Sequence, residues 1–368
     1  MSTRPHHPDY TLLACVFIIV VIGIVMLTSA SSVVSYEHFG SSNYLVNHQI
    51  IYGLLIGIAG MYVASRIEYH RWKKFALPLL VLTVILLIAV FIPGIGYGSG
   101  GARRWIAVAG NTFQPTELLK FSFILYLATW LEKRGKSIKD VSYGLVPFVV
   151  ILGALGLLII MEPDFGTLMV IAITSIIVYF VAGAPIKHLL WMFGGGLALF
   201  YLLIKTSSYR ADRLTVFLNP DLDPQGIGYH INQALLAVGS GGIFGLGLGH
   251  SRQKYNFLPE VTGDSIFAVI AEELGFILSL LLIGLYFIVM IRGFMTARRA
   301  PDTFGKLLAA GITSWITVQT LINIGAMVGL LPLTGIPLPF ISYGSSALAI
   351  SLTCVGVLLN ISKQTSTV

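Results

Sequence analysis

Three acidic residues lie close together where a polar stretch of the chain becomes a long apolar one. In SRQKYNFLPEVTGDSIFAVIAEELG, residues 251–275, Asp264 stands just before the apolar residues, and Glu272 and Glu273 follow inside the helix that Ser265 is expected to begin. An acid carried into hydrocarbon costs about 2.5–3.5 kcal/mol, so such residues usually face a cavity, a partner or a substrate. The simpler alternative for Asp264 is a helix N-cap, because Asp accepts the free amide hydrogens of a first turn. Capping and catalysis are compatible.

A second group of charged residues marks the start of another apolar helix, in GARRWIAVAGNTFQPTELLKF, residues 101–121. Pro115 suits a first helical turn, and Glu117 and Lys120 then share one helix face at a spacing of three residues. The pair could simply hold helices together, or it could line the same cavity as Asp264 and orient a polar substrate. Spacing alone does not decide between these two interpretations.

Basic residues gather on the same side of the expected membrane as Asp264. Arg103 and Arg104 lie there although the positive-inside rule disfavours them, which indicates an anionic ligand or, equally, contact with lipid headgroups. Arg210 and Arg213 belong to YRADRLTVFLNP, in which basic and apolar residues alternate in a way that predicts a short interfacial helix. A carboxylate beside several cations at an outer membrane surface suits a substrate with a lipid tail and phosphate charge.

Two further stretches are interrupted by turn-forming residues. LPLTGIPLPFISYGSSA, residues 331–347, is broken by Pro and Gly just before the last apolar helix. Non-helical backbone survives at membrane depth only where protein or a water-filled cavity satisfies its polar groups, so this segment, with Ser342 in it, is expected to line the site. EPDFGT, residues 162–167, is a short outer turn with two acids, and a turn is all that it needs to be.

The elements that must position these residues are membrane helices. The chain has 368 residues, 56% hydrophobic and 11% charged, and its mean hydropathy of +0.85 is typical of a polytopic membrane protein. Apolar runs of spanning length predict about ten transmembrane helices, in an all-α fold that forms a single domain over residues 1–368. The runs cover residues 10–31, 48–66, 75–94, 115–132, 144–161, 166–184, 187–205, 265–291, 304–330 and 341–361.

The distribution of basic residues orients this predicted bundle. If the N-terminus is cytoplasmic, most of the 23 Lys and Arg residues fall in inner loops and tails, so both termini are expected inside the cell. The net charge of +7 is then a property of the membrane topology, and no nucleic-acid partner is expected. Asp264 lies outside, next to one long extracytoplasmic loop, residues 206–263, between helices 7 and 8. Loops of this length are usually functional or disordered.

Two other features of the sequence predict little chemistry. Cys15 and Cys354 lie in the first and last apolar segments without CxxC or His spacing, which favours two free buried thiols over a metal site or disulfide. The glycine run AVGSGGIFGLGLGHS has the GxG spacing of phosphate loops, but no strand precedes it and no GKS or GKT follows. Glycines that allow tight turns and close backbone approach are the better interpretation.

These stretches together resemble the SEDS family (shape, elongation, division and sporulation), the bacterial membrane glycosyltransferases that include FtsW and RodA. The resemblance covers nearly the whole chain and rests on GARRWI, QPTELLK, EPDFGT, FLNPDLDPQGIGYHINQALLAVGSGGIFGLGLG, SRQKYNFLPEVTGDSIFAVIAEELG and LPLTGIPLPFISYGSS. GARRWI and SRQK are more similar to FtsW, the division member, than to RodA. Departures are modest: Thr116 replaces the usual Ser, His230 stands where Gln is common, Gly263 replaces a usual Thr, and Ser345 replaces the second Gly of SYGG.

The resemblance implies a glycosyltransferase that polymerises lipid II into β-1,4 glycan strands on the outer face of the bacterial cytoplasmic membrane, with undecaprenyl pyrophosphate leaving. An α-linked donor that gives a β linkage is inverted, so one displacement with a general base suffices, and Asp264 is the expected base. The leaving pyrophosphate needs positive charge, either from Arg or Lys near the site or from a divalent cation, Mg²⁺ or Mn²⁺, for which Asp264 is the candidate ligand. The expected cavity residues are Glu117, Lys120 and Ser342, and the expected phosphate contacts are Arg103, Arg104, Arg210 and Arg213.

The resemblance also implies a partner, a class B penicillin-binding protein whose transpeptidase crosslinks the new strands. Two alternatives from other functional classes are a lipid II flippase and a scaffold that only recruits enzymes. A flippase needs a similar cavity, although a transporter usually places its charges near the bilayer midplane rather than on the outer side. A scaffold is disfavoured by Glu117 and Lys120, because structure alone rarely demands charges inside a membrane.

Overall fold

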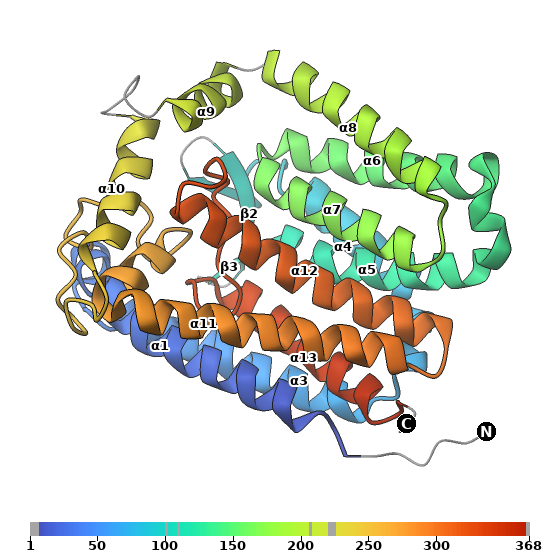
Figure 1. Ribbon diagram of the computed structural model, residues 1–368, viewed down its shortest axis with the longest axis horizontal. Helices are drawn as coiled ribbons and strands as arrows, with labels where there is room; N and C mark the ends of the chain where they lie inside the picture. The colour runs from blue at the N-terminus through green and yellow to red at the C-terminus, as the bar shows by residue number, and fades with distance from the viewer. Residues whose placement is uncertain (1–6, 100–101, 109–110, 206–207, 220–225, 366–368) are drawn as a thin grey trace.

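The computed structural model describes residues 7–99, 102–108, 111–205, 208–219 and 226–365. Long helices lie side by side and make up most of the molecule (Figure 1). In chain order the elements are α1 Tyr10–Phe39, α2 Tyr44–His48, the π-helix η1 Gln49–Leu55, α3 Ile56–Arg66, the 3-10 helix η2 Tyr69–Phe75, α4 Ala76–Ala89, β1 Gly96–Ser99, β2 Ala102–Val108, β3 Asn111–Phe113, α5 Pro115–Arg134, the 3-10 helix η3 Gly135–Lys139, the π-helix η4 Val141–Leu145, α6 Val146–Met161, α7 Phe165–Val181, α8 Ile186–Lys205, α9 Ser208–Leu218, α10 Ile227–Ser240, α11 Ile266–Arg299, α12 Thr303–Met327 and α13 Ser345–Ser362.

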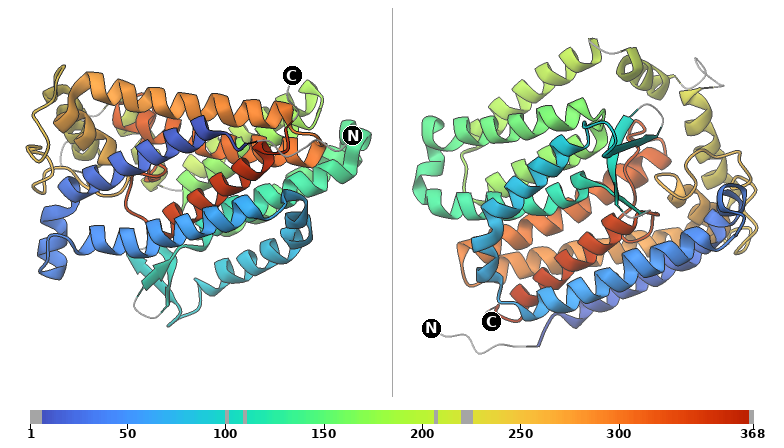
Figure 2. Two further views of the ribbon diagram at one scale, coloured as in Figure 1. Left: turned by 90° about the horizontal axis from the view of Figure 1, so that it is seen from below. Right: turned by 180° about the vertical axis from the view of Figure 1, so that it is seen from behind.

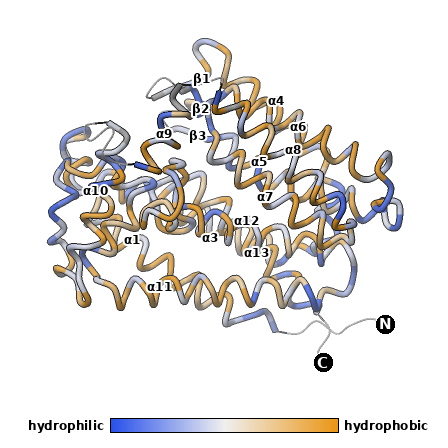
Figure 3. The backbone as a smooth tube through the Cα atoms, turned by 45° about the horizontal axis from the view of Figure 1, so that its top comes forward, coloured by the Kyte–Doolittle hydropathy of each residue, from blue (hydrophilic) through white to orange (hydrophobic). Residues whose placement is uncertain are grey.

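Seven helical segments within the described residues are long and apolar enough to cross a membrane. They are Tyr10–Phe39, Tyr44–Arg66, Tyr69–Ala89, Val141–Met161, Ile266–Arg299, Thr303–Met327 and Ser345–Ser362. Helices α7 and α8 add two shorter apolar segments. Hydrophobic residues follow the helices, and hydrophilic ones collect in the loops at their ends (Figure 3). The predicted multi-pass membrane character is thereby confirmed, because each predicted apolar run is largely helical.

The start of α1 and the end of α13 lie next to each other. The Asp9 backbone N–H donates to Ser362 Oγ at 3.0 Å, and Arg292 near the end of α11 pairs with the Asp9 carboxylate at 2.7 Å. The loop between α10 and α11 lies at the opposite end of the helices (Figures 1 and 2). Both ends of the described chain therefore share one side of the bundle, and the loop that leads to Asp264 lies on the other.

Strands β1, β2 and β3 form a small antiparallel sheet, which corrects the prediction of an all-α fold. Its strands follow the order β1-β2-β3, with Gly96 opposite Ile106 and Ile106 opposite Phe113. Strand β2 contains Trp105, Ile106 and Val108, which are aromatic and β-branched residues that favour strands. This segment is too rich in glycine for a stable helix. Pairing the strands gives its backbone N–H and C=O groups the hydrogen bonds that they would otherwise lack.

The long connection at residues 206–263 contains more helix than predicted. Helix α9 confirms the short helix predicted from YRADRLTVFLNP, whereas α10 was not predicted. Ile231, Ala234 and Ala237 are buried at helical spacing along one face of α10, a signal that could have identified it. In Figure 1, α8, α9 and α10 form an arch along one edge of the molecule, and α10 packs against α11.

Helix α11 is interrupted at Gly275, where φ is +77° and ψ is −177°. The glycine-rich loop after α10 lies against this break, and the Leu246 backbone N–H donates to the Glu272 carbonyl at 2.9 Å. A Cβ atom on Gly245 would lie 2.2 Å from the Glu273 carbonyl oxygen, so only glycine permits this approach. Close backbone approach, rather than a phosphate loop, is thus confirmed as a role of the glycine run.

Candidate active site

Asp264 lies at the junction between the long loop and α11, and only 8% of its surface is exposed. The N-cap of α11 is Ser265, so the simpler alternative, in which Asp264 is the N-cap, does not hold. Asn323 Nδ2, on α12, donates to the Asp264 backbone carbonyl at 2.8 Å, and Ser265 Oγ donates to Asp264 Oδ1 at 3.3 Å. The carboxylate is therefore held at a buried boundary between a polar loop and an apolar helix.

The broken segment between α12 and α13 packs beside Asp264. Ser342 Oγ donates to the Gly263 carbonyl at 2.6 Å and accepts from the Leu338 backbone N–H at 2.8 Å. At Gly335, where φ is +73°, an added Cβ atom would lie 3.9 Å from Asp264 Oδ2. Ser342 thus ties this segment to the residue that precedes Asp264, and it satisfies backbone groups that a membrane could not.

Glu117 and Lys120 form the predicted ion pair at the start of α5. Their charged atoms are 2.8 Å apart, and the side chains are only 2% and 3% exposed. Lys120 Nζ also donates to Gln319 Oε1 at 2.9 Å and lies 4.9 Å from the centre of the Trp315 ring. A small cavity beside Lys120 is lined by residues of α5, α7 and α12, and Asp264 is not among them. This cavity therefore adjoins the ion pair and is separate from Asp264.

Two buried amides of α12, which sequence reasoning missed, connect the ion pair to Asp264. Gln319 Nε2 donates to the Pro337 carbonyl at 2.8 Å. Asn323 Nδ2 donates to the Ile336 carbonyl at 2.9 Å as well as to the Asp264 carbonyl. Because the two amides are four residues apart, they share one face of α12. Polar residues at this spacing in an otherwise apolar helix need partners, which is the signal that could have found them.

Arg104 binds the EPDFGT turn. Its Nε donates to the Glu162 carbonyl at 3.1 Å, and a terminal nitrogen donates to the Pro163 carbonyl. The Glu162 side chain is fully buried, and neither carboxylate oxygen has a hydrogen-bond partner within the described residues. Burial, reinforced by the charge of Asp164, raises the pKa of Glu162 to about 8, although Arg104 opposes the rise. The turn therefore also holds an acid that stays protonated at neutral pH.

The other predicted phosphate contacts receive less support from the geometry. Arg103 is exposed on β2. Arg210 and Arg213 belong to α9, and their side chains lie outside the part of the chain that the structure describes. Among the described residues, no group of three or more His, Cys, Asp and Glu side chains could hold a metal ion. A cation at Asp264 would therefore depend largely on substrate oxygens and water, a pattern that Mg²⁺ accepts.

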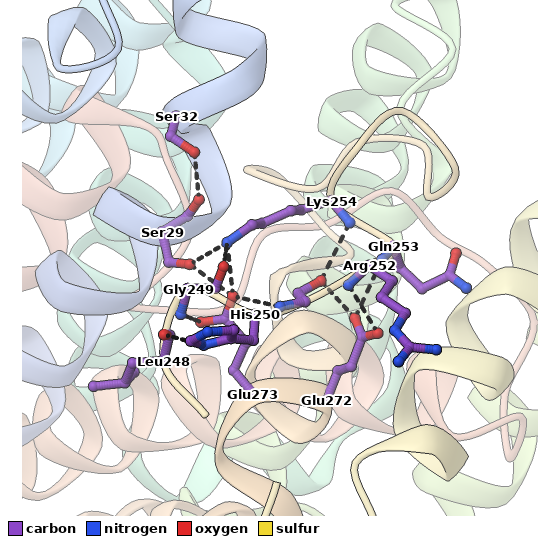
Figure 4. A network of polar contacts seen from close by, with 11 residues as sticks. Ser29, Ser32, Leu248, Gly249, His250, Arg252, Gln253, Lys254, Glu272 and Glu273 are labelled. Carbon is purple, nitrogen blue, oxygen red and sulfur yellow. Dashed lines mark hydrogen bonds and ion pairs between the residues drawn. The ribbon is translucent and has the colours of Figure 1, made fainter. Parts of the chain in front are cut away.

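Glu272 and Glu273 hold the loop after α10 rather than the broken segment (Figure 4). Glu273 Oε1 accepts from Lys254 Nζ at 3.0 Å and from Ser29 Oγ of α1 at 2.7 Å. Glu272 Oε1 accepts from the Arg252 backbone N–H at 3.1 Å. Glu273 is therefore buried with a cation, Glu272 is buried with neutral hydrogen-bond donors, and together they position the SRQK part of the loop.

The profile of the FtsW/RodA/SpoVE cell cycle protein family matches residues 9–367. Stage V sporulation protein E of Bacillus subtilis is 41% identical over 363 residues, which cover 99% of each chain. A probable peptidoglycan glycosyltransferase FtsW of Trichlorobacter lovleyi is 42% identical over 358 residues, covering 96% of this chain and 93% of that protein.

Solved structures match over the same extent. A chain from a study of the structural coordination of polymerization and crosslinking by a peptidoglycan synthase complex has a TM-score of 0.78 and 28% identity, covering 96% of this chain and 97% of its own. The crystal structure of the Thermus thermophilus rod shape determining protein RodA has a TM-score of 0.68 and 28% identity, covering 98% of both chains.

Proposed function

We propose that this chain is a peptidoglycan glycosyltransferase of cell division. It belongs to the FtsW/RodA/SpoVE family, which is the SEDS family that its motifs resemble. Relatives named FtsW, about 40% identical over nearly the whole chain, support the division role. The observation that carries the proposal is Asp264, a carboxylate 8% exposed that α11, α12 and the broken segment hold at one end of the membrane helices.

The chain forms one integral domain over residues 1–368 that crosses the bacterial cytoplasmic membrane ten times, with both termini in the cytoplasm. The contact between Asp9 and Ser362 supports an even number of crossings, because it places the start of α1 and the end of α13 on one side. The seven long apolar segments, together with α5, α7 and α8, would supply the ten. Asp264 and the broken segment then face the outside of the cell.

The reaction is the polymerisation of lipid II by inversion. The GlcNAc 4-hydroxyl oxygen of the acceptor substrate attacks the anomeric carbon of the donor substrate. The bond from that carbon to undecaprenyl pyrophosphate breaks, and Asp264 takes the hydroxyl proton. Exposed Arg103, together with Arg210 and Arg213, binds the leaving pyrophosphate, and Arg104 of β2 contributes charge beside the EPDFGT turn. Mg²⁺ or Mn²⁺, held by Asp264 and phosphate oxygens, would supply further charge stabilisation.

The remaining polar residues of the site position Asp264. Ser342 fixes the backbone at Gly263, and the Glu117–Lys120 pair anchors Gln319, whose amide holds the broken segment. A class B penicillin-binding protein is the proposed partner. The similar chain in a synthase complex that coordinates polymerization with crosslinking supports this pairing, since crosslinking needs a transpeptidase.

The test is polymerisation of fluorescent lipid II by the purified full chain with its class B penicillin-binding protein. Wild type is compared with Asp264→Asn, and Glu37→Gln, which changes an exposed acid on α1, serves as the control. Glycan ladders from wild type and Glu37→Gln, but none from folded Asp264→Asn, are expected. Ladders from Asp264→Asn would remove Asp264 as the base. No ladders from wild type, with lipid II moving between vesicle leaflets, would replace the polymerase with a flippase.

A further inference from the structure

A chain of three side chains joins the long loop to Asp264. His230, on α10, places its Nε2 atom 2.6 Å from Ser265 Oγ, and the same hydroxyl lies 3.3 Å from Asp264 Oδ1. Ser265 has no exposed surface, and His230 is partly buried. Thirty-five positions separate His230 from Ser265, so only the tertiary packing of α10 on α11 brings them together.

The direction of the hydrogen bonds follows from the chemistry of the three groups. A hydroxyl has one hydrogen to donate and two lone pairs that accept. An ionised Asp264 can only accept, and when Ser265 donates to Asp264 Oδ1 its hydroxyl oxygen accepts from a proton on His230 Nε2. With the other neutral tautomer, His230 would compete with Asp264 for the same hydrogen.

The position of His230 is itself fixed at the far end of its helix. Ser240, the last residue of α10, places its Oγ atom 3.4 Å from Glu272 Oε1, and Leu246 donates to the Glu272 carbonyl at 2.9 Å. These contacts hold α10 against the first two turns of α11. The histidine therefore meets Ser265 from a helix that is attached to α11 at both ends.

We propose that His230 is a positioning residue for the polymerase reaction, which acts through Ser265 to hold the Asp264 carboxylate in one orientation. The inference rests on the proposed function, in which Asp264 is the base. With Oδ1 held by Ser265, the carboxylate cannot rotate freely, and its other oxygen keeps a fixed direction toward the acceptor hydroxyl. Small errors in such an orientation slow a reaction strongly, because proton transfer needs a short and directed contact.

Steady-state polymerisation of lipid II with the class B partner tests this role through kcat and KM. His230→Ala should lower kcat about 10- to 100-fold and leave KM for lipid II unchanged, because the binding surface is not altered. His230→Gln should recover kcat to within about 3-fold, since its amide N–H can donate to the same hydroxyl. His250→Ala, which removes an exposed histidine of the same loop, is the matched control and should behave as wild type.

A double-mutant cycle separates this linkage from two independent effects. If His230 acts only through Ser265, then Ser265→Ala combined with His230→Ala should be no slower than the slower single variant. The proposal would be overturned if the fold-losses of kcat in the two single variants multiplied in the double variant. It would also be overturned by a wild-type kcat in His230→Ala, or by equal losses of kcat in His230→Ala and His230→Gln. If His230→Ala does not fold, Ser265→Ala is compared with the double variant Ser265→Ala with His230→Gln. A further loss of kcat in that double variant would also overturn the proposal.

Asp264→Asn in the same assay keeps the two hypotheses apart. An inactive Asp264→Asn beside a fully active His230→Ala would retain the proposed function and remove only the positioning role. An active Asp264→Asn would remove the proposed base, and with it the reason for a positioning residue.

Discussion

Glu162 should make the protein less stable as the pH rises. Burial raises its pKa from an ordinary value of 4.5 to about 8, and the described structure offers its carboxylate oxygens no hydrogen bond. Between these two values the folded protein keeps a proton that the unfolded chain has released, so unfolding becomes more favourable with rising pH. The penalty is absent well below pH 4.5, grows up to pH 8 and is constant above that.

The size of the effect follows from the two pKa values. Each pH unit within the interval changes the free energy of unfolding by about 1.36 kcal/mol. Between pH 5 and pH 7, where the unfolded chain loses most of its proton and the folded protein loses little, the loss is about 2.5 kcal/mol. The side chain in Glu162→Gln is neutral at every pH. The free energy of unfolding of Glu162→Gln minus that of wild type should therefore increase by about 2.5 kcal/mol between pH 5 and pH 7.

Thermal and denaturant unfolding of the detergent-purified chain at pH 5, 6, 7 and 8 would measure this difference. Glu37→Gln is the control, because this acid is exposed and its replacement should give a difference that does not depend on pH. A difference between Glu162→Gln and wild type that stays flat from pH 5 to pH 8 would refute the reasoning. The Glu162 carboxyl would then be ionised in the folded protein and paired with a group that compensates its charge.

Further substitutions test three single features of the structure. Gly275→Ala should lower the free energy of unfolding by about 3 kcal/mol or more, because φ is positive there and the added Cβ atom would lie 2.2 Å from a backbone nitrogen. The control Gly284→Ala, in open space on the same helix, should raise the free energy of unfolding by up to about 1 kcal/mol. Lys254→Met should cost about 3–5 kcal/mol by leaving Glu273 unpaired, and adding Glu273→Gln should restore most of the loss in the same unfolding assay. Ser342→Ala should lower the kcat of lipid II polymerisation about 10-fold without changing thermal stability by more than about 2 kcal/mol, because it releases the backbone before Asp264.

The sequence determined the features that depend on neighbouring residues. Apolar runs predicted where the helices lie because a membrane demands continuous hydrophobic length. Pro115 predicted the first turn of α5, and the spacing of Glu117 and Lys120 predicted their ion pair, because one helical turn brings such residues together. The resemblance of its motifs to the SEDS family was confirmed by the family match over residues 9–367.

Tertiary structure alone decided which groups surround Asp264. Asn323 and Gly335 lie next to it from 59 and 71 positions away, and His230 contacts the neighbouring Ser265 from 35 positions away. No local spacing encodes contacts of that kind. The same reason explains why Arg104, predicted from its charge to face a ligand, donates to the backbone of the turn that follows Glu162, on another segment. Periodicity records which face of an element is buried, but the identity of the neighbour depends on how distant segments pack, because a side chain's partners are set by folding of the whole chain.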